Sequence, residues 1–389
     1  MALKFQTLEM FHILLLSNAN YAIDLKTAIN KAIENYPSIK ALYEESHKFE
    51  GKYQAYKSYL NPTIGLTIEK NINSPYDFSY SQPITPIFTY IPHIKMVDYE
   101  KKAFLEKIKI EKFYIIGEVF LAYYNALYKK ELLKVAQENY NISEEIYNFV
   151  KKSFELGEAT KLELIKAESD LELSKSELEL SKNDYENSLK YLSSLIGENV
   201  ADIEEKFDNL RDMRNLKIEE LATIRYYNNT IKSISYGIIT QRILALPQIN
   251  IGVIAERNYS SNYILRYNFN LSIPIFYRRQ SEISELTSQK RSIEKLKELE
   301  ELKLERDFQI IRQRYTKLVE EIKKIEENTL KRTKEELSLA EKSYKLRVIT
   351  LLELLDAKRR YIEIQKYRLL LIMQAHQEYS NYLKIGGEL

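Results

Sequence analysis

The residues best suited to chemistry are charged side chains in two similar stretches of the chain. Glu353 and Asp356 are three residues apart, so on a helix they lie on one face as neighbours. Grouped carboxylates favour cations over anions, which makes this pair a candidate charged site. In the earlier stretch Glu163 corresponds to Glu353, but Lys166 takes the place of Asp356. The earlier stretch therefore cannot supply the same pair.

Both glutamates also have a structural explanation. Thr160-x-x-Glu163 and Thr350-x-x-Glu353 are capping boxes, in which the threonine hydroxyl accepts from the N3 amide and the glutamate accepts from the cap amide. The pattern predicts that a helix starts at each threonine. For Glu353, a role as helix cap and a role in the charged site remain equally open. The cap does not need Asp356, so the charged site is the favoured role for that residue.

The composition excludes several other kinds of site. There is no cysteine, so disulfides, thiolate metal sites and cysteine nucleophiles are absent. The four histidines are too scattered to form a local pair of metal ligands. The net charge of +2 comes from mixed charges and not from a basic stripe, which argues against a nucleic-acid partner. We find no catalytic nucleophile or phosphate loop, and expect neither an enzyme nor a cofactor.

The two stretches belong to an internal duplication. Phe154–Glu168 aligns with Tyr344–Lys358. The aligned identities are Leu156/Leu346, Thr160/Thr350, Leu162/Leu352, Glu163/Glu353, Leu164/Leu354 and Ala167/Ala357. Each copy predicts a tight turn between two antiparallel helices. Gly157 suits the left-handed residue that ends the first helix. The second copy has Arg347 there, so its turn must close differently or at a cost of about 1 kcal/mol.

Long helices lead into and out of these turns. The apolar spacing predicts helical structure over 24–59, interrupted at Pro37, and continuous helices over 93–156 and 276–346. The returning helices carry apolar residues every seven positions, the pattern of a coiled-coil seam. These residues are Leu164, Leu171, Leu178, Tyr185 and Leu192 in the first copy and Leu355, Ile362 and Leu369 in the second.

Each copy also contains a hairpin in which apolar and polar residues alternate. The strands are expected at about 62–70 and 76–84, and at about 247–257 and 262–274. Strands of this length can cross an outer membrane at a tilt, but four cannot close a barrel and open edges are not tolerated in lipid. We therefore expect a homotrimer with a 12-stranded barrel. Its apolar face would meet lipid and its Thr, Asn and Ser face would line water. The alternative is a soluble sheet packed on the helices.

The fold class follows from these elements. We expect a mainly α protein with a β-barrel section, built as a duplicated protomer of long antiparallel coiled-coil helices and two β-hairpins. Residues 1–22 resemble a secretory signal peptide, although an amphipathic N-terminal helix is an alternative. We assign 23–197 to the first repeat with its tip turn at 156–160, 198–217 to a connector, and 218–389 to the second repeat with its tip turn at 346–350.

The order of these motifs resembles the TolC-like outer membrane efflux proteins. A helix comes first, followed by Asn61-Pro62, a strand hairpin and Gln82-Pro83-Ile84. A long helix, an F-x-x-G-x-x-T-x-x-E turn and a heptad helix come next, and most of this order then repeats. The resemblance covers nearly the whole chain after the leader. The residues around the first hairpin look most like the CzcC-like heavy-metal exporter branch.

The resemblance implies a trimer in the cell outer membrane, with a helical tunnel extending into the periplasm. It implies a periplasmic adaptor and an inner-membrane transporter of RND or ABC type as partners. It places Glu353 and Asp356 at the tunnel entrance, where Glu163 is the equivalent of Glu353, and it suggests that Arg347 bridges to Glu163 or Asp356 when the tip closes. The family's usual gating arginine lies two residues further on, where this chain has Ile349.

The resemblance also assigns the adaptor-docking surface to the tips, at Leu156, Gly157, Leu346 and Arg347. These leucines could instead only cap the coiled coil. Two other functions remain open. A type I protein-secretion duct has the same architecture, and a soluble coiled-coil scaffold would explain the heptads but not the hairpins. The cargo cannot be read from such a duct.

Overall fold

The computed structural model describes residues 22–389 apart from 59, 69–76 and 258–262. The expected signal peptide, except for Ala22, and the tip of each hairpin lie outside these residues. The described chain divides into two compact units, one formed by residues up to 40, 111–216 and 306–389, and the other by 41–110 and 217–305. No helix among the described residues is both long and apolar enough to span a membrane.

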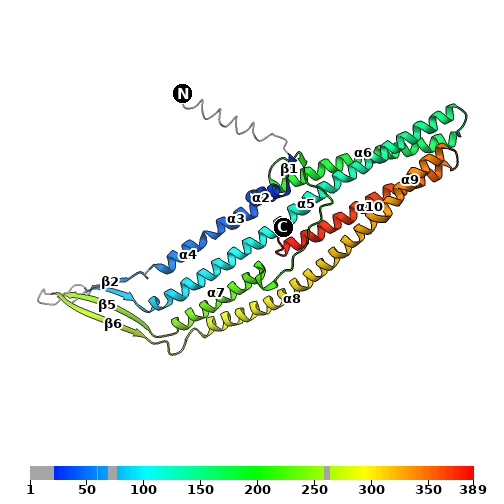
Figure 1. Ribbon diagram of the computed structural model, residues 1–389. Helices are drawn as coiled ribbons and strands as arrows, with labels where there is room; N and C mark the ends of the chain where they lie inside the picture. Colours follow the sequence, from blue (N-terminus) through cyan, green and yellow to red (C-terminus); the bar gives the residue numbers. More distant parts are fainter. Residues whose placement is uncertain (1–21, 59, 69–76, 258–262) are drawn as a thin grey trace, which may run out of the picture. The chain divides into compact units, whose positions relative to one another are not determined.

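The first unit is a group of long helices joined by the two predicted tip turns. It contains the C-terminal part of α5 (Tyr90–Glu155), α6 (Lys161–Ile196), the end of α8 (Gln280–Lys324), α9 (Leu330–Lys345) and α10 (Leu351–Lys384). Figure 1 shows α5 beside α6 and α9 beside α10, each pair joined by a short turn. The antiparallel helix pairs expected from the two turn motifs are therefore confirmed.

The heptad seam packs as predicted. Leu192, Ile362 and Leu369 are buried, and the earlier seam residues of α6 are half-buried. The second long helix differs from the expectation, because Ile325–Thr329 form a π-helical segment between α8 and α9. Such a segment accommodates one extra residue in a helix, and apolar spacing alone does not reveal it.

The connector takes part in the core of this unit. Its residues Ile203 and Phe207 are buried, and β4 (Asp202–Ile203) pairs in parallel with β1 (Ala22–Ile23). The Tyr123 hydroxyl donates to the Ile23 carbonyl at 2.8 Å. Helix α2 (Leu25–Asn35) also contacts α6. The connector is thus packed structure and not only a link between repeats.

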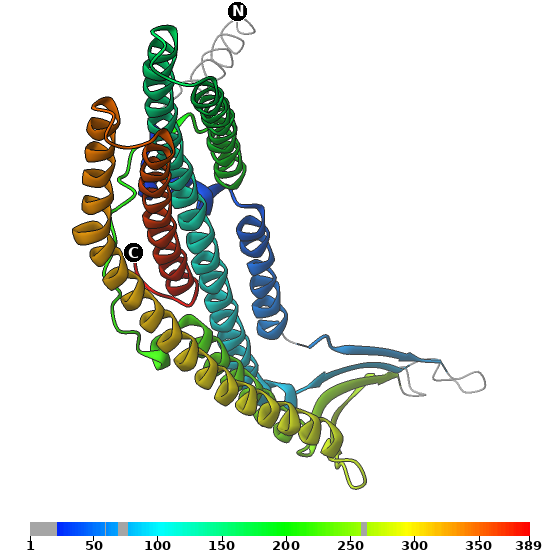
Figure 2. The same ribbon diagram turned by 90° about the vertical axis from the view of Figure 1, so that its right-hand side faces the viewer.

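The second unit contains a four-stranded antiparallel sheet. The strands are β2 (Thr63–Thr67), β3 (Asp77–Pro83), β5 (Gln248–Arg257) and β6 (Tyr263–Ser272), in the order β2-β3-β5-β6. The two predicted hairpins are therefore joined through β3 and β5, as Figure 2 shows. Strands β2 and β6 are the two edges of this sheet within the chain.

The strand register puts most of the apolar residues on one face, with Ile254 and Ile264 as exceptions. Ile64 lies opposite Tyr80, Tyr80 opposite Val253, and Val253 opposite Tyr267, so an apolar row crosses all four strands. A parallel row runs through Leu66, Phe78, Ala255 and Leu265. The other face carries mostly Thr, Ser, Asn and charged residues. The predicted alternation is confirmed in all four strands.

Short helices complete the second unit. Helices α3 (Pro37–Ser46) and α4 (Lys48–Lys57) precede β2, and α3 starts at Pro37, where a missing amide costs nothing. Phe49 packs against Phe104 of α5 in a small core. The 3₁₀ turn η1 (Thr85–Thr89) leads from β3 into α5, the 3₁₀ turn η2 (Ile218–Glu220) leads into α7 (Ala222–Leu244), and α7 leads into β5.

Candidate functional site

The two tip turns close in the same way although their sequences differ. Gly157 has φ 75° and Arg347 has φ 61°, so both occupy the left-handed region. The amide of Glu158 donates to the Ser153 carbonyl at 2.7 Å, and the amide of Val348 donates to the Ser343 carbonyl at 2.8 Å. Of the two alternatives for the second turn, the structure shows an unchanged closure, with arginine held in a conformation that costs about 1–2 kcal/mol.

Both predicted capping boxes are present. The Glu163 amide donates to the Thr160 hydroxyl at 3.2 Å, and the Thr160 amide donates to the Glu163 carboxylate at 2.7 Å. Thr350 and Glu353 repeat these contacts at 3.3 and 2.7 Å. The backbone amide and then the hydroxyl of Thr350 lower the pKa of Glu353, which favours its charged form. Glu353 is therefore an ionised capping residue on the surface. Its capping role is compatible with a second role in the charged site.

Arg347 connects the two turns. Its guanidinium forms an ion pair with the Glu158 carboxylate, and both side chains are about half exposed. The expected bridge from Arg347 to Glu163 or Asp356 is absent from the protomer. The physical reason is that Glu163 is already held by its own cap, while Asp356 is held by two arginines of its own helix.

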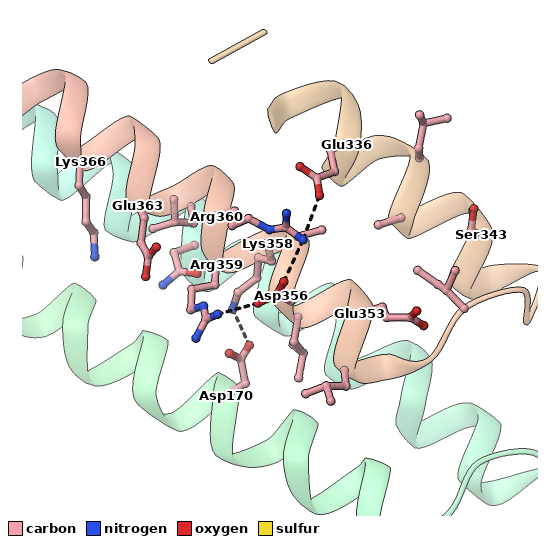
Figure 3. Close-up of a pocket in the computed structure, with 18 of the residues that line it drawn as sticks. Asp170, Glu336, Ser343, Glu353, Asp356, Lys358, Arg359, Arg360, Glu363 and Lys366 are labelled. Atoms are coloured by element: carbon pink, nitrogen blue, oxygen red, sulfur yellow. Dashed lines mark hydrogen bonds and ion pairs between the residues drawn. The ribbon is translucent and has the colours of Figure 1, made fainter. Parts of the chain in front are cut away.

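The environment of Asp356 contains charges of both signs. Its two carboxylate oxygens accept from Arg359 at 2.6 Å and from Arg360 at 2.9 Å, as Figure 3 shows. Arg360 also pairs with Glu336 of α9 at 3.1 Å. These groups line an open groove of about 950 Å³. The negative charge of Asp356 is thus largely balanced, so the carboxylate pair expected from the sequence is accompanied by basic groups.

A buried ion pair lies deeper in the same groove. The Lys358 side chain is only 5% exposed, and its Nζ donates to Asp170 of α6 at 2.5 Å and to the Ser143 hydroxyl of α5 at 2.8 Å. Two turns along α10, Lys366 pairs with Glu177 of α6. Figure 3 shows Lys358 reaching from α10 toward Asp170. These pairs join α10 to α6.

Sequence analysis did not select Lys358 or Glu158. A lysine in a helix is normally taken as part of the solvated face, and only its spacing relative to the buried Leu354 and Tyr361 could have indicated burial. Glu158 could have been found from the alignment of the two copies, because it is the position at which copy two has Val348.

The expected docking residues are exposed at the turns. Leu156 is 74% exposed and Leu346 is 75% exposed. Val348, which sequence analysis missed, is also 74% exposed. These three side chains make an apolar tip surface, and neither leucine packs into the coiled coil that it follows. Among the residues that the structure describes, no group of His, Cys, Asp and Glu is arranged to hold a metal ion.

Comparison with known proteins identifies the fold. No family model matches the chain, and no curated protein matches it in sequence. Among solved structures it is similar to CusC, with a TM-score of 0.78, 16% identity, and 95% of this chain and 94% of that chain covered. It is also similar to the outer membrane protein VceC from Vibrio cholerae (TM-score 0.75, 13% identity, 93% and 96% covered).

A third similar structure is the MtrE outer membrane channel of Neisseria gonorrhoeae in its open state, with a TM-score of 0.74, 17% identity, and 93% and 88% of the two chains covered. The chain thus has the fold of these channel proteins over nearly its whole length. The fold expected from the TolC-like resemblance is confirmed.

Proposed function

We propose that this chain is the protomer of a trimeric outer membrane channel that serves as the exit duct of a tripartite efflux system. The observation that carries the proposal is the exposed apolar face of the four-stranded sheet. Tyr267 is 85% exposed, and Ile64, Leu66 and Phe269 are 63–64% exposed. Isolated exposed apolar residues are common, but a continuous apolar face marks contact with lipid or with another protein.

The sheet edges support a trimer. A sheet in lipid must satisfy every backbone amide and carbonyl, so its edges have to pair with other strands. Strands β2 and β6 have no further strand beside them within the described chain. Pairing β6 of one copy with β2 of the next would close a twelve-stranded barrel from three copies, an even number within the known range. Its lumen would be lined by the polar face.

The tip surface supports the proposed partners. In this proposal the exposed Leu156, Leu346 and Val348 would contact a periplasmic adaptor, with Gly157 and Arg347 shaping the turns. The adaptor would connect the duct to an inner-membrane transporter of RND or ABC type. The duct itself would conduct passively and would not be an enzyme.

The proposed entrance gate includes Glu163, Arg347, Glu353 and Asp356. Arg347 would hold the two tip turns of a protomer together through Glu158, and Asp356 would set local charge together with Arg359. Because basic groups balance Asp356, we expect weaker cation preference than a bare carboxylate ring would give.

Extraction and mass measurement test the proposal. We expect the protein to leave the membrane fraction only with detergent and to have the mass of three chains in detergent solution. Planar-bilayer recordings should then show ion conductance. A matched pair of variants, Tyr267→Asp on the apolar face and Asn268→Asp on the polar face, should differ, with only the first losing membrane insertion. A monomer that stays in solution without detergent would contradict the proposal.

A further inference from the structure

A pocket lies where the first hairpin meets the helices, and we call it the hairpin-base pocket. Its volume is about 780 Å³, within the range of cavities that hold a drug-sized molecule. One wall is the end of α4 with the stretch that leads into β2, and the other is the end of β3 with η1 and the start of α5. The apolar and aromatic part of its lining includes Ala55, Tyr56, Leu60, Ile87, His93 and Leu244.

Contacts within the protomer fix both walls of the pocket. The Tyr56 ring stacks on the His93 ring, with 4.2 Å between the ring centroids and 13° between the ring planes. The Gln82 side-chain amide donates to the Leu60 carbonyl at 2.8 Å, which ties the stretch before β2 to β3. Leu60 and Ile87 nevertheless remain 51% and 54% exposed. The pocket is therefore preformed, and much of its apolar lining is left uncovered by the described chain.

The loop 274–279, between β6 and α8, presents an aromatic side chain that nothing in the described chain covers. Phe276 is 94% exposed. The loop itself is fixed in shape, because Arg279 has φ 55°, a left-handed conformation that is kept only when surrounding contacts determine it. One such contact is the Arg279 guanidinium, which donates to the Gln241 side-chain oxygen at 3.1 Å. Phe276 is thus carried by a defined turn, which Figure 2 shows at the start of α8.

The strand register indicates which segment of another copy would meet this loop. A single row crosses the sheet through Thr63, Ser81, Gly252 and Asn268, so the start of β2 and the end of β6 lie at the same end of the sheet. Strands β2 and β6 run in opposite directions, and in the proposed barrel β6 of one copy pairs with β2 of the next. The residues that follow β6 then lie beside the residues that precede β2 of the neighbouring copy. Those preceding residues form one wall of the hairpin-base pocket.

We propose that Phe276 of one copy enters the hairpin-base pocket of the next copy, so that each pocket is completed by a neighbouring subunit. This inference rests on the proposed trimer and names the residue and the cavity through which its subunits are joined. The pocket has room for Ile275, which is 67% exposed, beside Phe276. An aromatic side chain that fills a pocket is the kind of contact that dominates the energy of an interface. Because the turn and the pocket both exist in one protomer, association does not have to order either of them.

Photo-cross-linking tests this contact directly. Phe276 is replaced by p-benzoylphenylalanine, which keeps an aromatic side chain and on illumination bonds to groups that it touches. We expect covalent dimers and trimers in which this ring is joined to the pocket residues 55–58, 60, 87 or 93. Mixed trimers of two differently tagged chains show whether the joined peptides come from different copies. The same replacement at Leu173, which is 72% exposed on α6, should give no bond to these residues.

The mass of the unmodified protein in detergent separates this inference from the proposed function. If the protein has the mass of three chains but position 276 gives no bond to the pocket residues of another copy, the pocket assignment is overturned and the trimer stands. That outcome includes bonds to lipid or to the same chain. If the protein has the mass of one chain, the proposed trimer is wrong, and the pocket assignment fails with it.

An exchange of side-chain size between the loop and the pocket gives a second test. Phe276→Ala empties the pocket, so the rate at which subunits exchange between differently tagged trimers in detergent should rise about tenfold or more, the effect of losing a buried aromatic anchor. Ala55→Phe places a ring in the pocket from its own wall and should obstruct Phe276, which also speeds exchange. Leu156→Ala, at an exposed residue of the tip turn, is the control and should leave the rate unchanged.

The double variant decides whether Phe276 and this pocket act together. Phe276→Ala combined with Ala55→Phe again has one ring in each pocket, so its exchange rate should return most of the way to that of the unmodified protein. A double variant that exchanges as fast as the faster single variant would contradict the pairing of Phe276 with this pocket. An exchange rate unchanged by Phe276→Ala would overturn the proposal outright.

Discussion

Arg347 and Glu158 form an ion pair between the two tip turns, and each occupies a position at which the two aligned stretches, 154–168 and 344–358, differ. Arg347 stands where the first copy has Gly157, and Glu158 stands where the second copy has Val348. The two differences therefore meet in one contact. A backbone conformation that favours glycine is kept in the second turn by an arginine whose side chain reaches the first turn.

The first prediction concerns conductance. Removing the Arg347 guanidinium releases the contact between the turns, so Arg347→Ala should lower the fraction of time that single channels spend closed in planar bilayers. Glu158→Gln removes the same ion pair from the other side and should have a similar effect. Lys151→Gln, an exposed change on α5 near the turn, is the control. A closed fraction unchanged in both Arg347→Ala and Glu158→Gln would contradict a gating role for this contact.

The second prediction concerns stability at the same residue. Arg347→Gly removes an exposed ion pair worth about 0.2–1 kcal/mol, but it also relieves left-handed strain of about 1–2 kcal/mol. Strain relief is the larger effect, so the free energy of unfolding should stay constant or rise by up to about 2 kcal/mol. Arg347→Ala, which keeps the strain and loses the pair, should unfold more easily than Arg347→Gly in denaturant titrations. The opposite order would show that the ion pair dominates.

The sequence predicted those features that depend on local pattern. The capping boxes at Thr160 and Thr350 and the left-handed residue at Gly157 follow from a few neighbouring side chains, and all are present. Strand alternation also predicted which face of the sheet is apolar. Where the described residues allow a comparison, the strand ends differ slightly from the expected ones, for example Ser272 instead of 274 at the end of β6, because pattern does not fix element ends.

Contacts between distant segments could not be predicted in this way. The partner of Arg347, the joining of β3 to β5, and the burial of Lys358 all depend on how segments far apart in the chain meet. The start of α8 was also misplaced, at Phe276 instead of Gln280, because the loop that presents Phe276 is stabilised by side-chain contacts and not by helical periodicity.

The third prediction concerns the buried ion pair. Asp170→Ala leaves the Lys358 ammonium buried without a carboxylate, so the free energy of unfolding should fall by about 3–5 kcal/mol. The double variant Lys358→Met with Asp170→Leu removes both charges and should recover most of this loss. As a control on the same helix, Asp184→Ala breaks a more exposed pair with Lys129 and should cost less than about 1 kcal/mol. Equal losses for Asp170→Ala and Asp184→Ala would contradict the assigned burial.

The fourth prediction concerns ion selectivity at the proposed gate. Asp356→Asn removes one carboxylate but leaves Arg359 and Arg360, so each protomer becomes more positive there. The reversal potential in a salt gradient should shift toward anion preference. Arg359→Gln should shift it toward cations. Glu285→Gln, at an exposed position of α8 in the other unit, serves as the control and should cause no shift. If both gate substitutions leave the reversal potential unchanged, Asp356 does not line the conduction path.

The fifth prediction concerns pH. His376 is 1% exposed, its ring stacks on Tyr124 at 3.7 Å, and its Nε2 donates to the Phe207 carbonyl at 2.8 Å. Burial lowers the pKa of His376, the hydrogen bond to the Phe207 carbonyl partly opposes this, and the nearby Arg211 guanidinium adds to the decrease, so that the pKa is about 4. The unfolded chain, with an ordinary histidine pKa near 6.5, therefore binds more protons than the folded chain between these two values.

The direction of the pH dependence of stability follows from this difference in proton binding. The contribution of His376 is fully present above about pH 6.5 and is lost as the pH falls toward 4, amounting to about 3 kcal/mol because each pKa unit corresponds to 1.36 kcal/mol. Denaturant titrations at several pH values should show this decrease. His376→Gln keeps a side-chain amide able to donate to the Phe207 carbonyl but cannot titrate, so it should be less stable at pH 7 yet flatter in its pH dependence. A slope unaffected by His376→Gln would show that other groups cause the acid sensitivity.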